Sequence, residues 1–297
     1  MTMITKKEIR PLFVPRSRDS HKGTYGHLLL IGGSAGKVGA ILMSGRAALR
    51  SGAGLVTVAL PDKAFRKLSK NFLELMYESQ PSTPGGTLSR RGGKKIIQLL
   101  KGKSAVGMGP GMGNNADTKA ILGQVLKKCE QPIVLDADAL NLLAADKKEL
   151  GPLLKLRARL RSSTIVTPHP GEMARLAGTT IEKVQANRQG VAREFATQHH
   201  IFVVLKGYRT VVADPEGHLF INSTGNPAMA TAGMGDVLTG LLVSLLAQGF
   251  SPLNATLAAV YIHGRAGDRV ARRLGDRGLL AGDVIEEIPL ALREIMN

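Results

Sequence analysis

Residues 27–60 have the sequence HLLLIGGSAGKVGAILMSGRAALRSGAGLVTVAL, and this stretch decides the fold class. It opens with a short apolar run, 27–31, that ends in the glycine-rich segment 32–36, as a buried parallel strand does where it leads into a turn. Residues 38–51 then have helical periodicity, and a second apolar run follows at 55–60. The stretch predicts a strand–helix–strand unit with parallel strands.

The same alternation continues toward the carboxyl end of the chain. Short apolar runs predict further strands at 105–108, 133–135, 164–167 and 202–205. Helical periodicity predicts helices between them at 117–128, 171–177 and 181–198. Strands that alternate with helices of this length indicate an α/β fold with a mainly parallel central sheet.

A hairpin interrupts the alternation. Residues 210–213 and 218–221 flank the turn sequence Asp-Pro-Glu-Gly at 214–217, which predicts an antiparallel extension at one edge of the sheet. Three helices are predicted after it, at 236–248, 253–273 and 282–295. No stretch resembles a linker, so we expect residues 25–297 to form a single domain, preceded by an extension at 1–24.

The amino-terminal segment gives no sign of targeting. Residues 1–5, Met-Thr-Met-Ile-Thr, resemble a common vector-encoded leader, so we assign them no part in the fold. Residues 1–18 lack a secretory core, and no apolar run reaches the roughly 20 residues of a membrane span. Cys129 has no second cysteine with which to form a disulfide or a metal cluster. These features predict a cytoplasmic protein with no membrane partner.

The composition is strongly basic, with 40 Lys and Arg against 23 Asp and Glu and a net charge of +17. Nucleic acid is the obvious partner for such a chain. Aromatic residues make up only 4% and Trp is absent, so few side chains are available to stack on bases. The basic residues also fall at the spacing of solvated helix faces, as in Arg157, Arg159 and Arg161, and in Arg265, Arg269, Arg272 and Arg273. An anionic small ligand accounts for the charge as well, and nucleic-acid binding is a distant alternative.

The segments that follow the predicted strands are polar or rich in glycine. They are 32–34, 109–113, 136–138, 168–172 and 206–207. Turns alone account for any one of them, because Gly, Pro and Asp are turn residues. The carboxyl ends of parallel strands meet at one edge of a sheet, where ligands bind. Five such segments therefore predict a binding site at that edge.

The strongest local signal is the segment 226–236, NPAMATAGMGD, which leads into a helix that runs to Gly249. The free N–H groups and dipole of a helix N-terminus favour an anion, and glycines let a phosphate approach the backbone. Asp236 lies beside this predicted anion hole. The alternative is that Asp236 only caps the helix, but a cap needs no run of small residues ahead of it.

Seven segments carry a resemblance that covers nearly the whole chain from Tyr25. They are 26–34, 48–56, 109–113, 135–141, 167–172, 205–207 and 226–236. The Gly-Met-Gly-Asp helix start resembles the ribokinase-like superfamily, and together the segments resemble its nucleotide-dependent NAD(P)H-hydrate dehydratases. The resemblance implies a ribokinase-like three-layer α/β/α fold. It also implies a repair reaction, in which a hydrated, inactive nicotinamide cofactor is phosphorylated on its hydroxyl and then loses phosphate to restore NADH or NADPH.

The resemblance implies a phosphoryl-transfer centre. Asp236 is the implied catalytic base, and the implied anion hole consists of Ala232, Gly233, Met234 and Gly235. The implied nucleotide-binding residues are Lys206, Gly207, Tyr208, Arg209, Thr210 and Gly235. For Lys206, the alternative is an ordinary surface lysine.

The resemblance also implies a substrate side. The implied substrate-binding residues are Ala40, Gly109, Gly111, Asp138, Asn141, His169 and Asp236. Turn formation and helix capping are a nearly equal alternative for Asp138 and Asn141. Glu172 is expected to assist Mg²⁺ through a water molecule.

Bifunctional members of the family carry an additional epimerase domain, and this chain has no room for one before Tyr25. We therefore expect it to act on the (S) hydrate and to depend on a separate epimerase. The resemblance further implies ADP, rather than ATP, as the phosphoryl donor, and a homotetramer. A ribokinase-like small-molecule alcohol kinase is the main alternative, because the dehydratase reaction begins with the same phosphoryl transfer.

Overall fold

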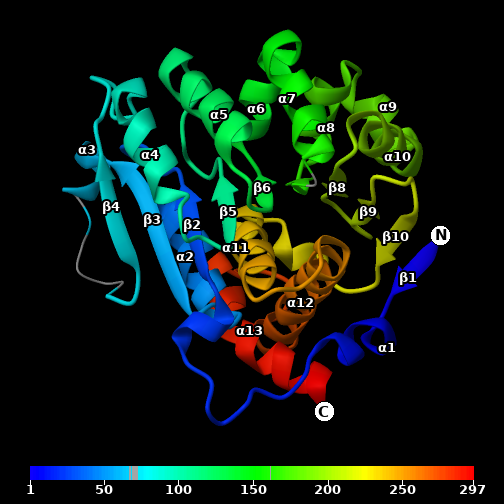
Figure 1. Cartoon of the computed structure of the whole chain (residues 1–297). Coiled ribbons are helices and arrows are strands. Elements are labelled where there is room, and N and C mark those ends of the chain that lie inside the picture. Colours follow the sequence, from blue (N-terminus) through cyan, green and yellow to red (C-terminus); the bar gives the residue numbers. More distant parts are fainter. Residues whose placement is uncertain (67, 69–72, 161) are drawn as a thin grey trace.

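The computed structural model describes residues 1–66, 68, 73–160 and 162–297, which contain one ten-stranded sheet (Figure 1). The strand order is β1-β10-β9-β8-β7-β6-β5-β2-β3-β4. The strands are β1 (Thr2–Ile4), β2 (His27–Ile31), β3 (Leu55–Pro61), β4 (Met76–Gln80), β5 (Ala105–Met108), β6 (Ile133–Leu135), β7 (Thr164–Val166), β8 (Phe202–Leu205), β9 (Val211–Ala213) and β10 (Leu219–Asn222). Only the β8–β9 and β9–β10 pairs are antiparallel, so the predicted mainly parallel sheet is confirmed.

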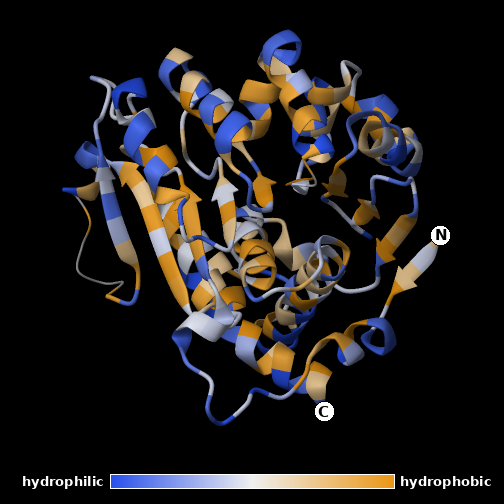
Figure 2. Cartoon of the chain, in the orientation of Figure 1, coloured by the Kyte–Doolittle hydropathy of each residue, from blue (hydrophilic) through white to orange (hydrophobic). Residues whose placement is uncertain are grey.

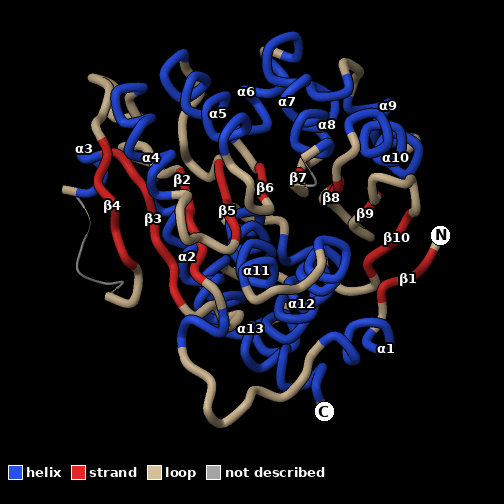
Figure 3. Tube along the Cα trace, in the orientation of Figure 1, coloured by secondary structure: helices blue, strands red, loops and turns tan. Residues whose placement is uncertain are grey.

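Helices cover both faces of this sheet and make a three-layer α/β/α architecture (Figures 1 and 3). One layer contains α2 (Val38–Arg50), α11 (Met234–Ala247), α12 (Pro252–Leu274) and α13 (Ala281–Met296). The other contains α4 (Gly93–Leu99), α5 (Ala116–Lys128), α6 (Asp138–Ala145), α7 (Lys147–Arg159), α8 (Pro170–Ala177), α9 (Ile181–Ala186) and α10 (Arg188–His199). The remaining described elements are two short α-helices, α1 (Lys6–Ile9) and α3 (Asp62–Phe65), and the 3-10 helices η1 (Arg10–Leu12), η2 (Lys22–Tyr25), η3 (Arg90–Gly92) and η4 (Pro227–Met229).

The hydrophobic core is divided between the two faces of the sheet. Apolar side chains point alternately to opposite faces along each strand, so Leu28 and Leu30 pack in one core while Leu29 and Ile31 pack in the other. Figure 2 shows the strands as mostly hydrophobic and the helices as mixed. Burial on both faces explains why continuous apolar runs, rather than alternating ones, predict these strands.

The sequence missed some elements for identifiable reasons. The edge strand β4 has the sequence MYESQ, whose polar residues give no apolar run. The predicted helix at 181–198 is two helices, because the side chain of Asn187 accepts a hydrogen bond from the Gly190 N–H and starts α10 anew. The helices α4, α6 and α7 were not predicted.

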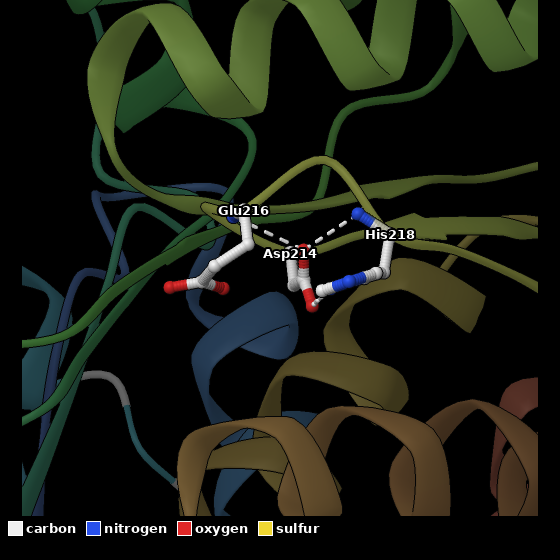
Figure 4. A group of neighbouring side chains, drawn as sticks. All are labelled: Asp214, Glu216 and His218. Carbon is white, nitrogen blue, oxygen red and sulfur yellow. Dashed lines mark hydrogen bonds and ion pairs between the residues drawn. The ribbon is translucent and has the colours of Figure 1, made fainter.

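The predicted hairpin is confirmed, and its turn is closed by Asp214 (Figure 4). One Asp214 carboxylate oxygen accepts the backbone N–H groups of Glu216 (3.1 Å) and His218 (2.8 Å). The other oxygen lies 2.8 Å from His218 Nδ1. These bonds hold the turn at the end of the sheet away from the carboxyl ends of β2–β8.

The amino-terminal residues correct the sequence analysis. Residues 2–4, to which we assigned no part in the fold, form β1, which pairs in parallel with β10. Ile4 and Ile9 are 1% and 0% exposed and pack in the core, and burial of such side chains stabilises a fold. Residues 1–24, which we predicted to be an extension that precedes the domain, therefore contribute a strand to its sheet and side chains to its core.

Arg157 is a second correction, because it does not lie on a solvated helix face. Its side chain is buried and donates to Thr164 Oγ1 (2.9 Å) and to the carbonyl oxygens of Cys129 and Gln131 (2.8 Å for Gln131). Arg159 is exposed, as predicted, and Arg161 lies outside the described residues.

The basic residues of α12 follow the prediction only in part. Arg265 and Arg269 are half-buried in ion pairs with Glu294 and Glu287 of α13, whereas Arg272 and Arg273 are exposed. In the part of the chain that the structure describes, no helix is long and apolar enough to cross a membrane.

Candidate active site

The carboxyl ends of the parallel strands meet at one edge, as predicted, and backbone hydrogen bonds join the loops that follow them. The Gly33 N–H donates to the Pro110 carbonyl oxygen at 2.9 Å. The Lys206 N–H donates to the Pro168 carbonyl oxygen, also at 2.9 Å. The strand order reverses direction between β2 and β5, where a parallel sheet opens a crevice for ligands.

The helix α11 starts at this edge without a side-chain cap. Its N-cap residue is Gly233, whose φ of 91° lies in the left-handed region that favours glycine. Within the described residues, no hydrogen bond joins the Asp236 side chain to the backbone. Asp236 therefore does not cap the helix, which was the alternative to a catalytic role. The first backbone N–H groups of α11 are available to bind an anion.

Asp236 is half-buried, and burial is the main reason that its pKa is raised to about 7. The carboxylates of Asp136, Asp138 and Glu172 add to this effect, and the Lys206 ammonium group opposes it. A carboxyl group with such a pKa exchanges a proton readily near neutral pH, as a general base must.

Lys206 is the cation at the centre of these carboxylates. Its Nζ lies 2.8 Å from Asp136 Oδ1 and 3.8 Å from Glu172 Oε2, and its side chain is 20% exposed. Asp136 Oδ2 also accepts a hydrogen bond from Thr239 Oγ1 at 2.9 Å. Burial alone would raise the pKa of Asp136, but Lys206 and these hydrogen bonds hold it below its usual value. The alternative of an ordinary surface lysine is therefore wrong.

A pocket of about 400 Å³ opens beside α11. All the predicted nucleotide-binding residues line it: Lys206, Gly207, Tyr208, Arg209, Thr210 and Gly235. Its far wall comes from α12 and from the loop that connects β10 to α11. A Cβ on Gly235 would lie 3.1 Å from Lys206 Nζ, so a side chain there would press on the tip of Lys206.

Two of the predicted substrate-binding residues, Gly109 and Gly111, lie in the loop after β5 and pack against Asp136 and Ala40, respectively. A Cβ on Gly109 would lie 1.8 Å from the Asp136 carbonyl oxygen. One on Gly111 would lie 2.4 Å from the Lys37 carbonyl oxygen and 3.3 Å from the Ala40 Cβ. Close packing therefore requires both glycines and brings Ala40 to the β2–β5 crevice.

The side chains of Asp138 and Asn141, the next two predicted substrate-binding residues, accept hydrogen bonds from other parts of the protein. Asp138 Oδ2 accepts the Gly113 N–H at 2.8 Å, which ties the loop after β5 to the start of α6. Asn141 Oδ1 accepts Arg175 Nη2 at 2.9 Å. Neither bond is a turn or a helix cap, which was the alternative for these residues, and a contact with substrate stays a prediction.

His169 and Glu172 form a reciprocal cap at the start of α8. His169 Nδ1 accepts the Gly171 N–H at 3.0 Å, and Glu172 Oε2 accepts the His169 N–H at 2.8 Å. The His169 side chain is still 51% exposed, so its ring can contact a ligand, whereas Glu172 is buried. Burial is the main cause that raises the pKa of Glu172.

The carboxylates at this edge are of the ligand type that magnesium prefers. Asp138 and Glu172 each add to the raised pKa of Asp236, so both lie close enough to interact with its charge, although their ligand atoms do not form a tight cluster among the described residues. Mg²⁺ prefers oxygen ligands and keeps several waters, so loosely grouped carboxylates suit it.

A family model described as NAD(P)H-hydrate dehydratase matches residues 28–290 of the chain. The chain belongs to the NAD(P)H-hydrate dehydratase family. The matched range contains every catalytic, nucleotide-binding and substrate-binding residue that we predicted, and it begins after β1 and α1.

Relatives of known sequence support the family. The bifunctional NAD(P)H-hydrate repair enzyme Nnr of Moorella thermoacetica is 42% identical over 99% of this chain and 54% of its own length. The ADP-dependent (S)-NAD(P)H-hydrate dehydratase of Neisseria meningitidis is 38% identical over 92% of this chain and 87% of its own length. The chain spans about half the length of the first of the curated relatives that it matches.

A solved structure gives the same result for the fold. The ADP/ATP-dependent NAD(P)H-hydrate dehydratase of Bacillus subtilis, co-crystallised with ATP and Mg²⁺, superposes with a TM-score of 0.84. It is 31% identical, and the match covers 99% of this chain and 98% of that one. A solved ribokinase-like superfamily protein also shares the fold, so the predicted ribokinase-like fold is confirmed.

Sequence reasoning missed two residues of this dehydratase-family site. Asp136 was noted only as part of a strand end, and its partner Lys206 is 70 positions away. Arg188 was not noted at all, although it supports the predicted nucleotide-binding loop. Its guanidinium donates to the carbonyl oxygens of Leu205 (3.0 Å), Lys206 (3.3 Å) and Tyr208. Asp136 could have been predicted as a site residue, because it directly follows an apolar strand. No sequence pattern around Arg188 indicates its role.

We expect Arg188→Met to raise the KM for the nucleotide about tenfold, with kcat changed less than about threefold, because it loosens the loop at 206–210 without touching Asp236. Steady-state kinetics with varied nucleotide measure both constants. Arg193→Met, at an exposed position on the same helix, is the control and should match the native protein. An unchanged nucleotide KM in Arg188→Met would show that the loop holds its shape without the guanidinium.

Proposed function

We propose that the protein restores hydrated nicotinamide cofactors by ADP-dependent dehydration of (S)-NADHX and (S)-NADPHX. The observation that carries the proposal is the position of Asp236. This carboxyl group, with its pKa raised to about 7, directly follows Gly235, which lines the nucleotide-sized pocket, and interacts with the charge of Asp136, whose carbonyl oxygen packs against Gly109. The names of the relatives support the substrate and the nucleotide.

The first step is phosphoryl transfer to the hydrate. The Asp236 carboxylate takes the proton from the hydrate hydroxyl, whose oxygen attacks the terminal phosphorus of ADP, and the bond to the bridging oxygen breaks to release AMP. Backbone N–H groups of residues 232–235 stabilise the charge on the transferred group. Lys206 adds a cation, with Asp136 fixing the position of its ammonium group.

The second step is elimination. The carbon–oxygen bond breaks, phosphate leaves with its electron pair, and the neighbouring ring carbon loses a proton to water, which restores the ring double bond. Phosphorylation matters because phosphate is a far better leaving group than hydroxide. Ala40, Gly109, Gly111 and His169 would position the hydrate for this step, and Asp138 and Asn141 would support them.

Magnesium would be held through water by Glu172 and Asp138, beside Asp236. When bound, Mg²⁺ neutralises charge on the phosphate oxygens of the nucleotide. Glu172 also holds the His169 backbone, so it would link the metal side to the substrate side.

The setting of this activity is also a proposal. We propose a cytoplasmic homotetramer that relies on a separate epimerase to convert the (R) hydrate into the (S) form. The resemblance to the stand-alone dehydratases supports this arrangement.

The direct test is recovery of reduced-nicotinamide absorbance from purified (S)- and (R)-NADHX with Mg²⁺ and either ADP, ATP or no nucleotide. The proposal expects recovery from the (S) hydrate with ADP and none without a nucleotide. A phosphorylated product that accumulates without recovery of absorbance would identify a small-molecule kinase instead. Recovery from both epimers at equal rates would contradict the expected dependence on a separate epimerase.

The pKa of Asp236 predicts a pH dependence. Because this pKa is raised to about 7, the base is protonated and inactive at lower pH. We expect kcat/KM for the hydrate to fall about tenfold per unit below pH 7 and to level off above it. Initial rates between about pH 5.5 and 8.5 measure the profile. A level profile across this range would exclude Asp236 as a base with a raised pKa.

A further inference from the structure

A second pocket of about 400 Å³ lies beside the short helix α3, and we call it the α3 pocket. Its lining residues come from the segments that follow β2, β3 and β4, which are neighbouring parallel strands (Figure 1). They are Ala35, Lys63, Arg66, Pro84, Gly85 and Gly86. The α3 pocket therefore lies at the carboxyl edge of the sheet, the edge that also holds the candidate active site.

The α3 pocket is positively charged. Lys63 and Arg66 line it, and none of the described residues that line it carries a carboxylate. Lys63 Nζ donates to the Pro84 carbonyl oxygen at 2.8 Å, its one hydrogen bond among the described residues, which leaves two ammonium protons for a ligand. Arg66 Nη2 lies 3.5 Å from Asp62 Oδ2, and an exposed pair at this distance is weak. Both cations are therefore available to an anion.

The loop after β2 joins the α3 pocket to the crevice at β2 and β5. On one side, the Ala35 N–H donates to the Gly86 carbonyl oxygen at 2.9 Å, and both residues line the α3 pocket. On the other side, the Gly33 N–H donates to the Pro110 carbonyl oxygen, next to Gly111. A ligand in the crevice is therefore separated from the α3 pocket by a single loop.

The order of the sites along the edge of the sheet limits how a long substrate lies. The nucleotide-binding loop follows β8, the crevice lies between β5 and β2, and the α3 pocket lies beyond the ends of β2, β3 and β4. In the proposed function, ADP fills the pocket beside Asp236 and the hydrated ring lies in the crevice. The rest of the dinucleotide has to avoid ADP, and the direction away from ADP along this edge leads to the α3 pocket.

We propose that Lys63 and Arg66 bind a phosphate group of the hydrated dinucleotide. The hydrates of NADH and NADPH both carry a diphosphate bridge, and the hydrate of NADPH carries a further phosphate on its adenosine ribose. Ammonium and guanidinium groups bind phosphate through charge-assisted hydrogen bonds. The inference rests on the proposed function, because it takes the hydrate as the ligand of the crevice. It adds a substrate-binding subsite outside the segments that carry the family resemblance.

The test is steady-state kinetics at saturating ADP with (S)-NADHX and with (S)-NADPHX, followed by recovery of reduced-nicotinamide absorbance. The variants are Lys63→Met, Arg66→Met, the double variant, and Arg66→Lys, which keeps the charge. Lys95→Met is the matched control. Lys95 is also exposed, and its Nζ also donates to a backbone carbonyl oxygen, that of Ser79 at 3.2 Å, but it lies outside the α3 pocket. Thermal melting checks that each variant is folded.

We expect each substitution by Met to raise the KM for the hydrate about threefold to fivefold, and the double variant to raise it about tenfold or more. The kcat should change less than about twofold, because a phosphate contact far from the ring acts equally on ground state and transition state. Arg66→Lys should keep most of the native affinity, and Lys95→Met all of it. An effect on both hydrates assigns the contact to the diphosphate bridge, and an effect on (S)-NADPHX alone assigns it to the phosphate on the adenosine ribose.

Three results would overturn the inference. A native KM for both hydrates in the folded double variant would exclude the α3 pocket as a phosphate subsite. A raised KM in Lys63→Met that Arg66→Met does not share would assign the effect to the lost bond with Pro84, and so to a loosened loop. A raised KM for ADP would place the two cations in the nucleotide site. If the native protein restores neither hydrate, the proposed function itself fails, whereas native turnover with unaffected variants contradicts this inference alone.

Discussion

Asp236→Asn should lower kcat for dehydration of (S)-NADHX by about 10² to 10⁴, the range that general acid–base catalysis contributes. The amide keeps the size of the side chain but cannot take the hydroxyl proton. Recovery of reduced-nicotinamide absorbance measures kcat, and calorimetry with ADP measures the nucleotide affinity, which should change less than about threefold. The affinity measurement separates a lost base from a lost binding site.

The control for this variant is Asp214→Asn, at a buried carboxylate in the β9–β10 turn, on the opposite end of the sheet. It should keep native kcat. Because burial raises the pKa of Asp236 from 3.8 to about 7, the stability that this group contributes falls as pH rises between these two values and stays at the lower level above about pH 7. Asp236→Asn removes this cost, so its melting temperature at pH 8 should be no lower than native. A variant that keeps native kcat, or that is inactive because it has unfolded, contradicts the assignment.

Arg157→Met should lower the free energy of unfolding by about 2–4 kcal/mol, the largest stability effect that we expect. The guanidinium is buried and has no carboxylate partner among the described residues; its hydrogen bonds go to Thr164 and to the ends of α5 and β6. Methionine fills the space but leaves those oxygens unpaired. Urea denaturation followed by circular dichroism measures the difference.

Arg159→Met, two positions along the same helix, is the matched control. Arg159 is exposed, so its substitution should change stability by less than about 0.5 kcal/mol. The comparison removes the effect of helix propensity and of net charge, which are the same in both variants. A loss below about 1 kcal/mol for Arg157→Met would mean that water replaces the guanidinium at little cost.

The two arginines also show what the sequence can and cannot predict. The spacing of Arg157 and Arg159 is compatible with one helix face, but consecutive odd positions on a helix lie about 200° apart, so one faces inward. Which one is buried depends on β7 and on the segment after α5, which the local pattern does not contain. The bounds of the strands at 105–108 and 133–135 were predicted correctly to the residue. A strand that is buried on both faces of the sheet has a continuous apolar run, which is easy to recognise in the sequence.

The candidate site was predictable to a similar degree. The edge of the sheet and the start of α11 follow from local patterns of glycine and small residues. The ion pair of Asp136 with Lys206 and the support of the loop by Arg188 join segments far apart in the chain. Such pairs depend on how the strands are ordered in the sheet, and strand order is a property of the whole fold rather than of any one segment.

The strand β1 has a practical consequence for handling the protein. It covers β10, whose last residue, Asn222, lines the nucleotide-sized pocket. Deleting residues 1–5 would expose the hydrogen-bonding groups of β10 along an apolar edge, which is a template for aggregation. It would also remove the Ile4 carbonyl oxygen to which Ser223 Oγ donates at 2.6 Å. Affinity tags therefore belong at the carboxyl terminus, beyond α13, and trimming the amino terminus for crystallisation would put solubility and nucleotide binding at risk together.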